Sequence, residues 1–180
     1  MKEEKRREVQ ERAFQFLKQA HIFITGQEKQ DMEVADCGLD DIERLGLQAV
    51  IYVNNDRYCA KELILFPRQM FPEHRHPPIN GTNPGKRETF RCRWGEVFLY
   101  VEGTPTPDPR AKVPEQYRKH LSVFKEIVLR PGGQYTLEPN SKHWFQAGEE
   151  GAVVSEFSSS SVDDRDLFTD PEVQRIPVIE

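Results

Sequence analysis

The chain has 180 residues, which predicts one domain, and 37% of them are hydrophobic and 10% aromatic, enough to bury one core. The formal net charge of −5 argues against the basic surface of a nucleic-acid-binding protein. No run of apolar residues is longer than five, so we expect no membrane span. The charged N-terminus has no apolar segment behind it, and we expect no secretory signal. Neither nucleic acid nor a membrane is therefore an expected partner.

The first 47 residues are predicted to form a helical N-terminal extension. Residues 3–20 are rich in helix formers, and their apolar side chains recur at helical spacing. Residues 40–45 predict a second, short helix, because acidic residues fill its first turn and Gly46 follows its end. The stretch between the two helices, residues 20–38, is expected to be irregular.

From residue 48 onward the pattern changes to short segments rich in β-branched and aromatic residues, separated by Gly and Pro. Many short strands at this spacing are typical of an antiparallel sandwich or barrel. We therefore predict a single all-β domain over residues 1–180, with the N-terminal helices packed outside it. One long proline-rich loop, residues 103–119, interrupts the series. The predicted strands are residues 49–53, 59–66, 88–93, 97–102, 123–129, 134–137, 144–147 and 152–157.

Three cysteines, Cys37, Cys59 and Cys92, are widely spaced and odd in number. They form neither a disulfide framework nor a C-x-x-C motif. Reduced thiols of this kind are typical of cytoplasmic proteins, and we expect a cytoplasmic location.

Two histidines, His74 and His76, are separated by one residue, so they lie on the same face of an extended strand. Such a pair can converge on one ion, although an H-x-H pair by itself is usually an exposed polar face. Glu88 follows at the start of the next predicted strand, and His143 comes much later in the chain. Three imidazoles and one carboxylate together suit a divalent ion such as Mn, Fe, Co, Ni or Zn.

The order of these residues resembles the two motifs of the cupin superfamily. The first motif contains H-x-H, a Glu and a Gly, and the second a Gly, a Pro and a His. The resemblance implies a cupin-type β-barrel, or jelly roll, with one metal site. The insertion between His76 and Glu88 is longer than in most cupins, and Glu73 is an alternative for the acidic ligand. The matching residues are His74, His76, Glu88 and Gly95 for the first motif, and Gly133, Pro139 and His143 for the second.

Within the cupins, residues 71–103 and 155–168 resemble the D-lyxose isomerase family. That resemblance implies a metal-dependent aldose–ketose isomerase for D-lyxose and D-xylulose, with D-mannose and D-fructose as a second candidate pair. We expect Mn²⁺ as the ion, with Zn²⁺, Co²⁺, Fe²⁺ and Ni²⁺ as alternatives. Carried over by position, the metal ligands would be His74, His76, Glu88 and His143, while Lys86 and Asp166 would position the sugar.

The predicted strand 152–157 places Glu156 on the same face as Ala152 and Val154. An acid on an inward, apolar face costs free energy unless it is paired or used. We therefore predict that Glu156 is the general base for the proton on C2, with Lys86 as a catalytic donor to a sugar oxygen. A solvent-facing Glu on an edge strand is the alternative.

Other functions suit the same ligands and stay open at this point. A metal-dependent cupin dioxygenase and a cupin-type phosphosugar isomerase are alternative enzymes, and oxygen consumption would identify the first. A non-catalytic sugar-binding module on the same barrel is a third possibility, recognised by binding without turnover. Pairing of sheet edges between two copies would give a homodimer.

Overall fold

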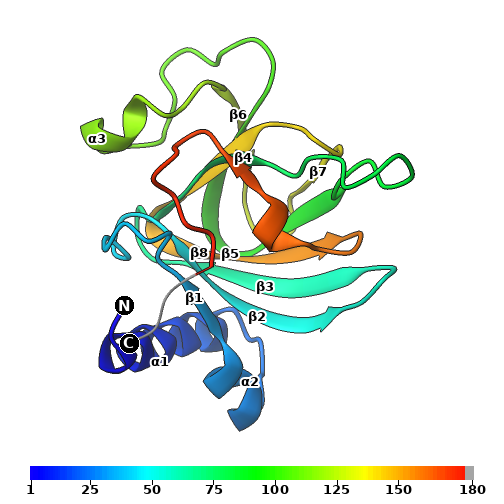
Figure 1. Ribbon diagram of the computed structural model, residues 1–180. Coiled ribbons are helices and arrows are strands. Elements are labelled where there is room, and N and C mark those ends of the chain that lie inside the picture. The colour runs from blue at the N-terminus through cyan, green and yellow to red at the C-terminus, as the bar shows by residue number, and fades with distance from the viewer. Residues whose placement is uncertain (177–180) are drawn as a thin grey trace.

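Two long, bent strands form the centre of the fold in the computed structural model, which describes residues 1–176 (Figure 1). They are β5 (Glu88–Val101) and β8 (His143–Ser158), and they pair antiparallel along most of their length. The register shifts in the middle of the pair, around Gly95. Because both strands bend there, one sheet curls into a barrel. The gaps predicted at residues 94–96 and 148–151 are therefore wrong, since both strands continue through them.

The remaining strands extend the sheet from the two central ones. Their bounds are β1 Glu33–Ala35, β2 Leu47–Asn54, β3 Cys59–Leu65, β4 Met70–Arg75, β6 Lys125–Leu129, β7 Gln134–Leu137 and β9 Leu167–Phe168. On one side of the bend, β8 pairs with β3, which leads on to β2 and β1, and β5 pairs with β7. On the other side, β8 pairs with β4, which leads to β9, and β5 pairs with β6. The predicted all-β barrel is confirmed.

The N-terminal helix α1 (Glu3–Gln19) packs outside the barrel, as predicted. Acidic residues in its first turn and Lys18 in its last turn complement the helix dipole. Its apolar face, with Ala13 and Leu17 fully buried, packs against outward-facing side chains that include Ile64 of β3 and Val153 of β8. The helix therefore covers the outer face of the β2–β3–β8 sheet and leaves the inner face to the barrel core.

The helix predicted at residues 40–45 does not form. Arg44 and Leu45 close a single turn by donating to the carbonyl of Asp41. The next backbone groups bond to another segment, because Gly46 donates to the carbonyl of Met70 and Met70 donates to that of Arg44. Pairing with the start of β4 thus replaces the hydrogen bonds that would continue a helix.

The stretch predicted to be irregular contains a short helix, α2 (Gly26–Asp31). Thr25 and Glu28 form a reciprocal capping box at its N-terminus, and the T-x-x-E spacing in the sequence is the signature of this motif. The short strand β1 lies in the same stretch, so the N-terminal extension is not purely helical.

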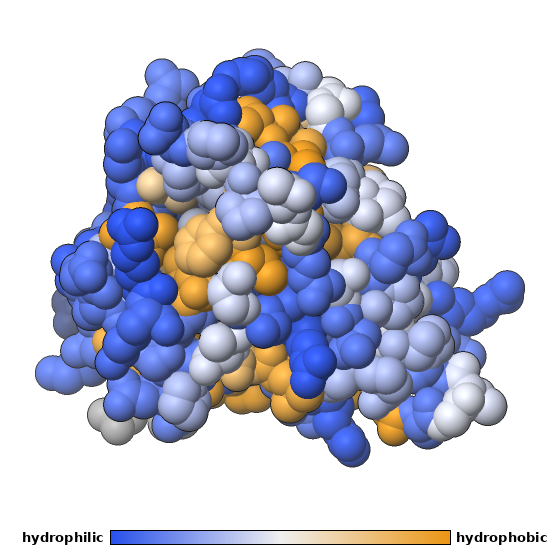
Figure 2. Space-filling view, turned by 90° about the horizontal axis from the view of Figure 1, so that it is seen from above, coloured by the Kyte–Doolittle hydropathy of each residue, from blue (hydrophilic) through white to orange (hydrophobic). Residues whose placement is uncertain are grey.

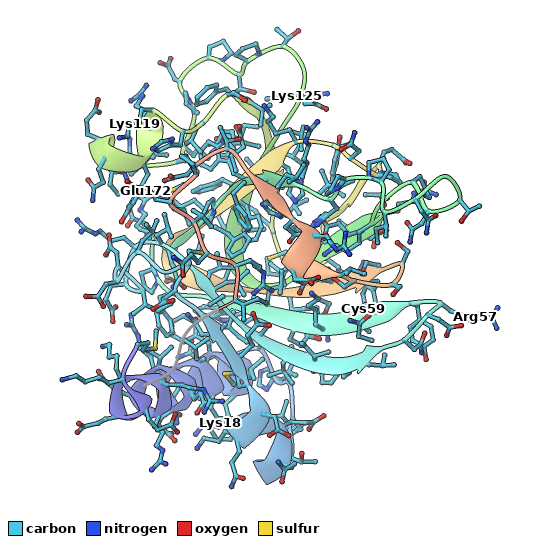
Figure 3. All side chains as sticks on the ribbon, in the orientation of Figure 1. Lys18, Arg57, Cys59, Lys119, Lys125 and Glu172 are labelled. Carbon is cyan, nitrogen blue, oxygen red and sulfur yellow. The ribbon has the colours of Figure 1, made fainter. Side chains whose placement is uncertain are left out.

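The proline-rich loop covers a second outer face of the barrel and contains the one-turn helix α3 (Glu115–Arg118). Beneath it, Trp144 stacks on Tyr100 with ring centroids 4.0 Å apart, and Val123 and Phe124 pack around them. Figure 2 shows the molecule from above this region, where hydrophobic side chains lie among mostly hydrophilic ones. In Figure 3, Lys119 and Lys125 of this region lie at the opposite end of the molecule from Lys18 of α1.

Within residues 1–176 no helix is long and apolar enough to cross a membrane. Cys37, Cys59 and Cys92 are all free and buried.

The bend of β5 depends on a glycine. Gly95 has a φ of +70°, and an added Cβ would overlap the carbonyl oxygen of Gly151 on β8. Gly132 also has a positive φ, of +90°, but an added Cβ there meets nothing within 4 Å. We expect Gly132→Ala to cost about 1–2 kcal/mol for the strained backbone alone. Gly95→Ala adds the collision, and we expect a total of about 2–4 kcal/mol.

Thermal unfolding of the two variants measures this difference. The melting temperature of Gly95→Ala should fall several degrees further than that of Gly132→Ala. Equal losses would mean that close approach of β5 and β8 does not require a glycine at this position.

Candidate functional site

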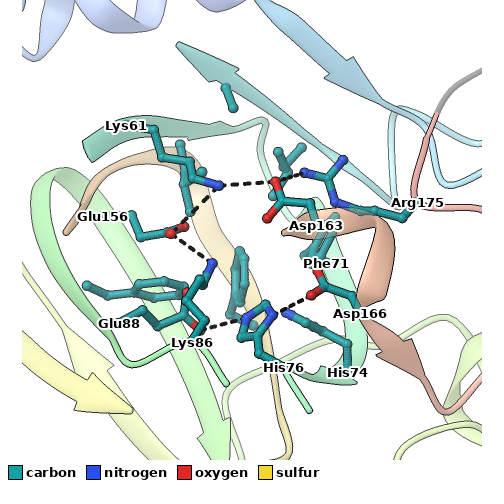
Figure 4. A pocket seen from close by; sticks show the side chains of 15 residues that line it. Lys61, Phe71, His74, His76, Lys86, Glu88, Glu156, Asp163, Asp166 and Arg175 are labelled. Carbon is teal, nitrogen blue, oxygen red and sulfur yellow. Dashed lines mark hydrogen bonds and ion pairs between the residues drawn. The ribbon is translucent and has the colours of Figure 1, made fainter. Parts of the chain in front are cut away.

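A cavity lies inside the barrel (Figure 4). Its apolar part is formed by side chains of the core, among them Phe71, Phe90 and Phe145. The other part is lined by buried and half-buried charged and imidazole groups from β3, β4, β5 and β8, from the connection between β4 and β5, and from the segment that follows β8. These polar lining residues are Lys61, His74, His76, Lys86, Glu88, Glu156, Asp163, Asp166 and Arg175.

Three histidines cluster in this cavity, with one ligand atom of each within 4.8 Å of the others. His74 lies on β4 directly opposite His143 on β8, and His76 follows just after β4 ends. The Nδ1 of His74 donates to the carbonyl of Pro72 at 2.8 Å, and that of His143 to the carbonyl of Ser141 at 3.0 Å. These bonds leave the Nε2 atoms of both rings as free lone-pair donors.

One feature of the cluster itself indicates that it fits a divalent ion. The Nε2 of His143 is buried and has no hydrogen-bond partner within the described residues, although it lies 3.1 Å from Oε1 of Glu88. An unpartnered buried nitrogen is costly in a folded protein unless a ligand satisfies it. Burial and the neighbouring imidazoles also hold the pKa of His74 well below its usual value, so that ring is neutral, as metal ligation requires.

Glu88 converges on the same cluster despite the long insertion before it. One carboxylate oxygen, Oε1, lies 3.1 Å from the Nε2 of His76 and 3.1 Å from the Nε2 of His143. Burial raises the pKa of Glu88, but the charges of Lys86 and His76 outweigh it and hold the pKa well below its usual value. The carboxylate is therefore ionised and lies beside the histidines, where it could serve as a fourth ligand.

The alternative acid, Glu73, faces away from the cluster. Its carboxylate accepts hydrogen bonds from the Ser122 hydroxyl at 2.8 Å and the Thr169 hydroxyl at 2.6 Å. Adjacent residues on a strand point to opposite faces, so Glu73 and His74 cannot serve one site. Glu73 instead anchors the segments before β6 and after β9 to β4.

Asp166 contacts a histidine of the cluster. Its Oδ1 accepts a hydrogen bond of 2.5 Å from the Nδ1 of His76, and Asp166 directly follows the 3-10 helix η1 (Asp163–Arg165). Burial lowers the pKa of His76, but Glu88 and Asp166 outweigh it and raise the pKa to about 9. The contact that the structure shows for Asp166 is thus with His76, and the predicted contact with the sugar stays a prediction.

Glu156 and Lys86 form a buried pair next to Glu88. The Nζ of Lys86 lies 2.9 Å from Oε1 of Glu156 and 2.8 Å from Oε2 of Glu88. Burial lowers the pKa of Lys86, but the two carboxylates outweigh it and hold the pKa well above its usual value. Glu156 is 3% exposed and points inward, which excludes the solvent-facing alternative.

Three further charged residues line the cavity that were not predicted from the sequence. Lys61 on β3 lies 3.3 Å from Asp163, and Asp163 lies 2.9 Å from Arg175, which also pairs with Glu33 of β1. Lys61 could have been found from the sequence, because it lies two residues before Leu63 and therefore on the same face of the strand. Asp163 and Arg175 could not, because they lie on an irregular segment that only the folded chain brings to the cavity.

Comparison with known proteins identifies the class of the fold. No family model matches the chain. Among solved structures, the L-ribose isomerase of Acinetobacter sp. DL28 in complex with L-ribose has a TM-score of 0.83 and 14% identity. The L-ribose isomerase of Cellulomonas parahominis with no ligand has a TM-score of 0.82 and 15% identity. Each match covers 100% of this chain and 98% of the other. The protein is a cupin-type barrel with the fold of these isomerase structures.

Sequence comparison then gives the family. The D-lyxose ketol-isomerase of Thermofilum sp. is 61% identical over 173 residues, which are 96% of each chain. The D-lyxose/D-mannose isomerase of Thermosediminibacter oceani is 59% identical over 180 residues, covering 100% of this chain and 99% of the other. The D-lyxose ketol-isomerase of Cohnella laeviribosi is 58% identical, covering 97% of this chain and 95% of the other. The chain belongs to the D-lyxose ketol-isomerase family.

The raised pKa of His76 predicts how metal binding depends on pH. In the metal-free protein His76 is protonated below about pH 9, and it must lose that proton to ligate an ion. The affinity for Mn²⁺ should therefore rise by about tenfold per pH unit from neutral pH toward pH 9. In the Asp166→Asn variant the affinity for Mn²⁺ should stop rising at a lower pH, because one of the acids that raise the pKa of His76 is gone. Calorimetric titration with Mn²⁺ at a series of pH values measures both curves.

Two histidine variants control this experiment. His143→Ala should lose the binding, whereas His21→Ala, at an exposed position, should retain it. An affinity that is constant above pH 7, or unchanged in His143→Ala, would contradict the assignment of the cluster.

Proposed function

We propose that this protein is a metal-dependent aldose–ketose isomerase that interconverts D-lyxose and D-xylulose by moving a proton between C2 and C1. The observation that carries the proposal is the arrangement of one cavity: a three-histidine cluster with Glu88 lies next to the buried Glu156–Lys86 pair. An isomerase of this kind needs a group that polarises the oxygens of C1 and C2 and a base beside the carbon atoms. D-mannose and D-fructose are a second substrate pair, in line with the name of one relative.

His74, His76, Glu88 and His143 would hold the ion, which we propose to be Mn²⁺. Three neutral nitrogen donors and one carboxylate also suit Zn²⁺, Co²⁺, Fe²⁺ and Ni²⁺. When bound, a divalent ion supplies Lewis-acid polarisation of the sugar oxygens and stabilises the negative charge that develops on them. Asp166 acts on this centre through His76, whose ring it orients by the hydrogen bond to Nδ1.

Glu156 would take the proton from C2 of the open-chain sugar and return it to C1. The carboxylate has the nearby ammonium group of Lys86 as a partner, so it is buried without being an isolated charge. A base that holds the proton inside the barrel can deliver it to the neighbouring carbon of the same substrate. Lys86 would donate a hydrogen bond to a sugar oxygen and stabilise the charge that forms during the transfer.

The cellular setting and the assembly belong to this proposal as well. We infer a cytoplasmic location because the thiols are free and buried, and burial raises the pKa of Cys37 to about 12 and keeps it unreactive. A homodimer formed through a sheet edge stays a prediction.

The activity test is ketose formation by the metal-reconstituted protein. With Mn²⁺ restored, D-lyxose should give D-xylulose and D-mannose should give D-fructose, and the two rates are measured separately. Other free aldoses serve as the comparison panel. Oxygen uptake should be absent, whereas uptake with no ketose formed would favour the dioxygenase. Binding of D-lyxose without any turnover would favour a sugar-binding module.

Glu156→Gln tests the base. The variant keeps the shape of the side chain and removes its basicity, and it leaves Lys86 paired with Glu88 and Lys61 paired with Asp163. We expect turnover to fall by about 10²–10⁴-fold with unchanged metal content. Exchange of the C2 hydrogen with deuterated solvent should fall with it.

Glu62→Gln is a matched control, because Glu62 is also a buried acid. It lies on the face of β3 that points away from the cavity, and its carboxylate accepts a hydrogen bond from the Ser155 hydroxyl. Its turnover should stay near that of the wild type. Near-normal turnover of Glu156→Gln, or no C2 exchange in the wild type, would remove Glu156 from the role of base.

A further inference from the structure

Lys61 is a buried lysine in the cavity that the proposed proton transfer does not use. Its side chain is 4% exposed, and it shares the inner face of β3 with Leu63 and Leu65. In the pairing of β3 with β8 it lies directly opposite Glu156. Burial of an ammonium group on an apolar face is costly, so its presence requires partners that use its charge and its donors.

The hydrogen-bonding capacity of Lys61 is only partly used. An ammonium group has three N–H donors. Among residues 1–176, the Nζ of Lys61 makes one hydrogen bond, of 3.3 Å, to Oδ2 of Asp163. Its distance of 3.7 Å to Oε1 of Glu156 is an ion pair that is too long for a hydrogen bond. Donors therefore remain uncommitted in a side chain that lines the cavity.

Each acid next to Lys61 also has a second, closer cation. Glu156 has Lys86 at 2.9 Å, and Asp163 has Arg175 at 2.9 Å. Each of these contacts is shorter than the one that the same acid makes with Lys61. A role as a counter-ion accordingly accounts for the charge of Lys61 but leaves its spare donors unexplained.

Lys61 and the histidines lie at different ends of the cavity. Figure 4 shows His74 and His76 at one end and Lys61 with Arg175 at the other, with Glu156 and Lys86 between them. A chain of contacts connects the ends, from Glu88 through Lys86 and Glu156 to Lys61. A sugar with C1 and C2 beside the histidines and Glu156 would extend its remaining carbons toward Lys61.

We infer that Lys61 is a substrate-binding residue whose ammonium group donates a hydrogen bond to an aldose hydroxyl remote from C1 and C2, on C4 or C5. The inference rests on the proposed function, because that function sets which end of the sugar faces the histidines. D-lyxose and D-mannose differ beyond C4, where D-mannose has one more carbon. Lys61 therefore also contributes to the choice between a five-carbon and a six-carbon aldose.

The test is a cycle that combines Lys61→Met with sugars lacking one hydroxyl. Values of kcat/KM are measured for wild type and variant on D-lyxose, 4-deoxy-D-lyxose and 5-deoxy-D-lyxose. On D-lyxose the variant should lose about 10- to 100-fold, mostly through KM, since a hydrogen bond from a charged donor is lost. On the deoxy sugar that lacks the partner hydroxyl, wild type and variant should be nearly equal. The same loss on all three sugars would overturn the inference.

Lys125→Met is the matched control, since Lys125 is an exposed lysine on β6 at the outer edge of the molecule (Figure 3). It should retain wild-type kcat/KM on every sugar. Metal content and thermal unfolding check that each variant is folded. If Lys61→Met does not fold, Lys61→Arg keeps the charge and narrows the cavity. Its kcat/KM should then fall further on D-mannose than on D-lyxose, and equal losses would contradict the inference.

A binding measurement separates this inference from the proposed function. D-arabinitol, the polyol obtained by reduction of D-lyxose, retains the remote hydroxyls and cannot be isomerised. Calorimetry with Mn²⁺-loaded protein should show about 10- to 100-fold weaker binding of D-arabinitol to Lys61→Met than to wild type. Equal affinities would overturn the role of Lys61. Absence of turnover on aldoses by the wild type would instead overturn the proposed function.

Discussion

The carboxylate of Glu88 is the contact on which the rest of the cavity depends. One of its oxygens lies 3.1 Å from the Nε2 atoms of His76 and His143, and the other lies 2.8 Å from the Nζ of Lys86. It therefore joins the candidate metal centre to the pair that would transfer the proton. Glu88 is the first residue of β5, and the bend of this strand at Gly95 also curls the sheet.

Buried charge in this protein is tolerated because opposite charges alternate through the cavity. From Glu88 the contacts run through Lys86, Glu156 and Lys61 to Asp163, and on to Arg175 and Glu33. A single buried ion would cost several kcal/mol, and each member of this chain has at least one partner of opposite sign. These ion pairs connect the inner face of the barrel to β1 and to the segment after β8. The N-terminal region and the C-terminal segment thereby become part of the site.

The parts of the site that follow from local periodicity could be predicted from the sequence. His74 and His76 share a face because they are two residues apart, and the same alternation places Glu156 inward with Ala152 and Val154. The partnership of Lys61 with Glu156 could not be predicted, since it depends on the register between β3 and β8. The helix expected at residues 40–45 fails for a similar reason: its backbone groups pair with Met70, which is distant in sequence. The presence of strands was therefore predictable, whereas contacts between distant segments required the structure.

The most direct test of this account is the position of the ion itself. A crystal structure of the protein grown with Mn²⁺, with data collected at the manganese absorption edge, locates the ion by anomalous scattering. We expect one strong peak inside the barrel, bonded to the Nε2 atoms of His74, His76 and His143 and to the carboxylate of Glu88. A peak on other residues, or no peak in the cavity at saturating Mn²⁺, would contradict it.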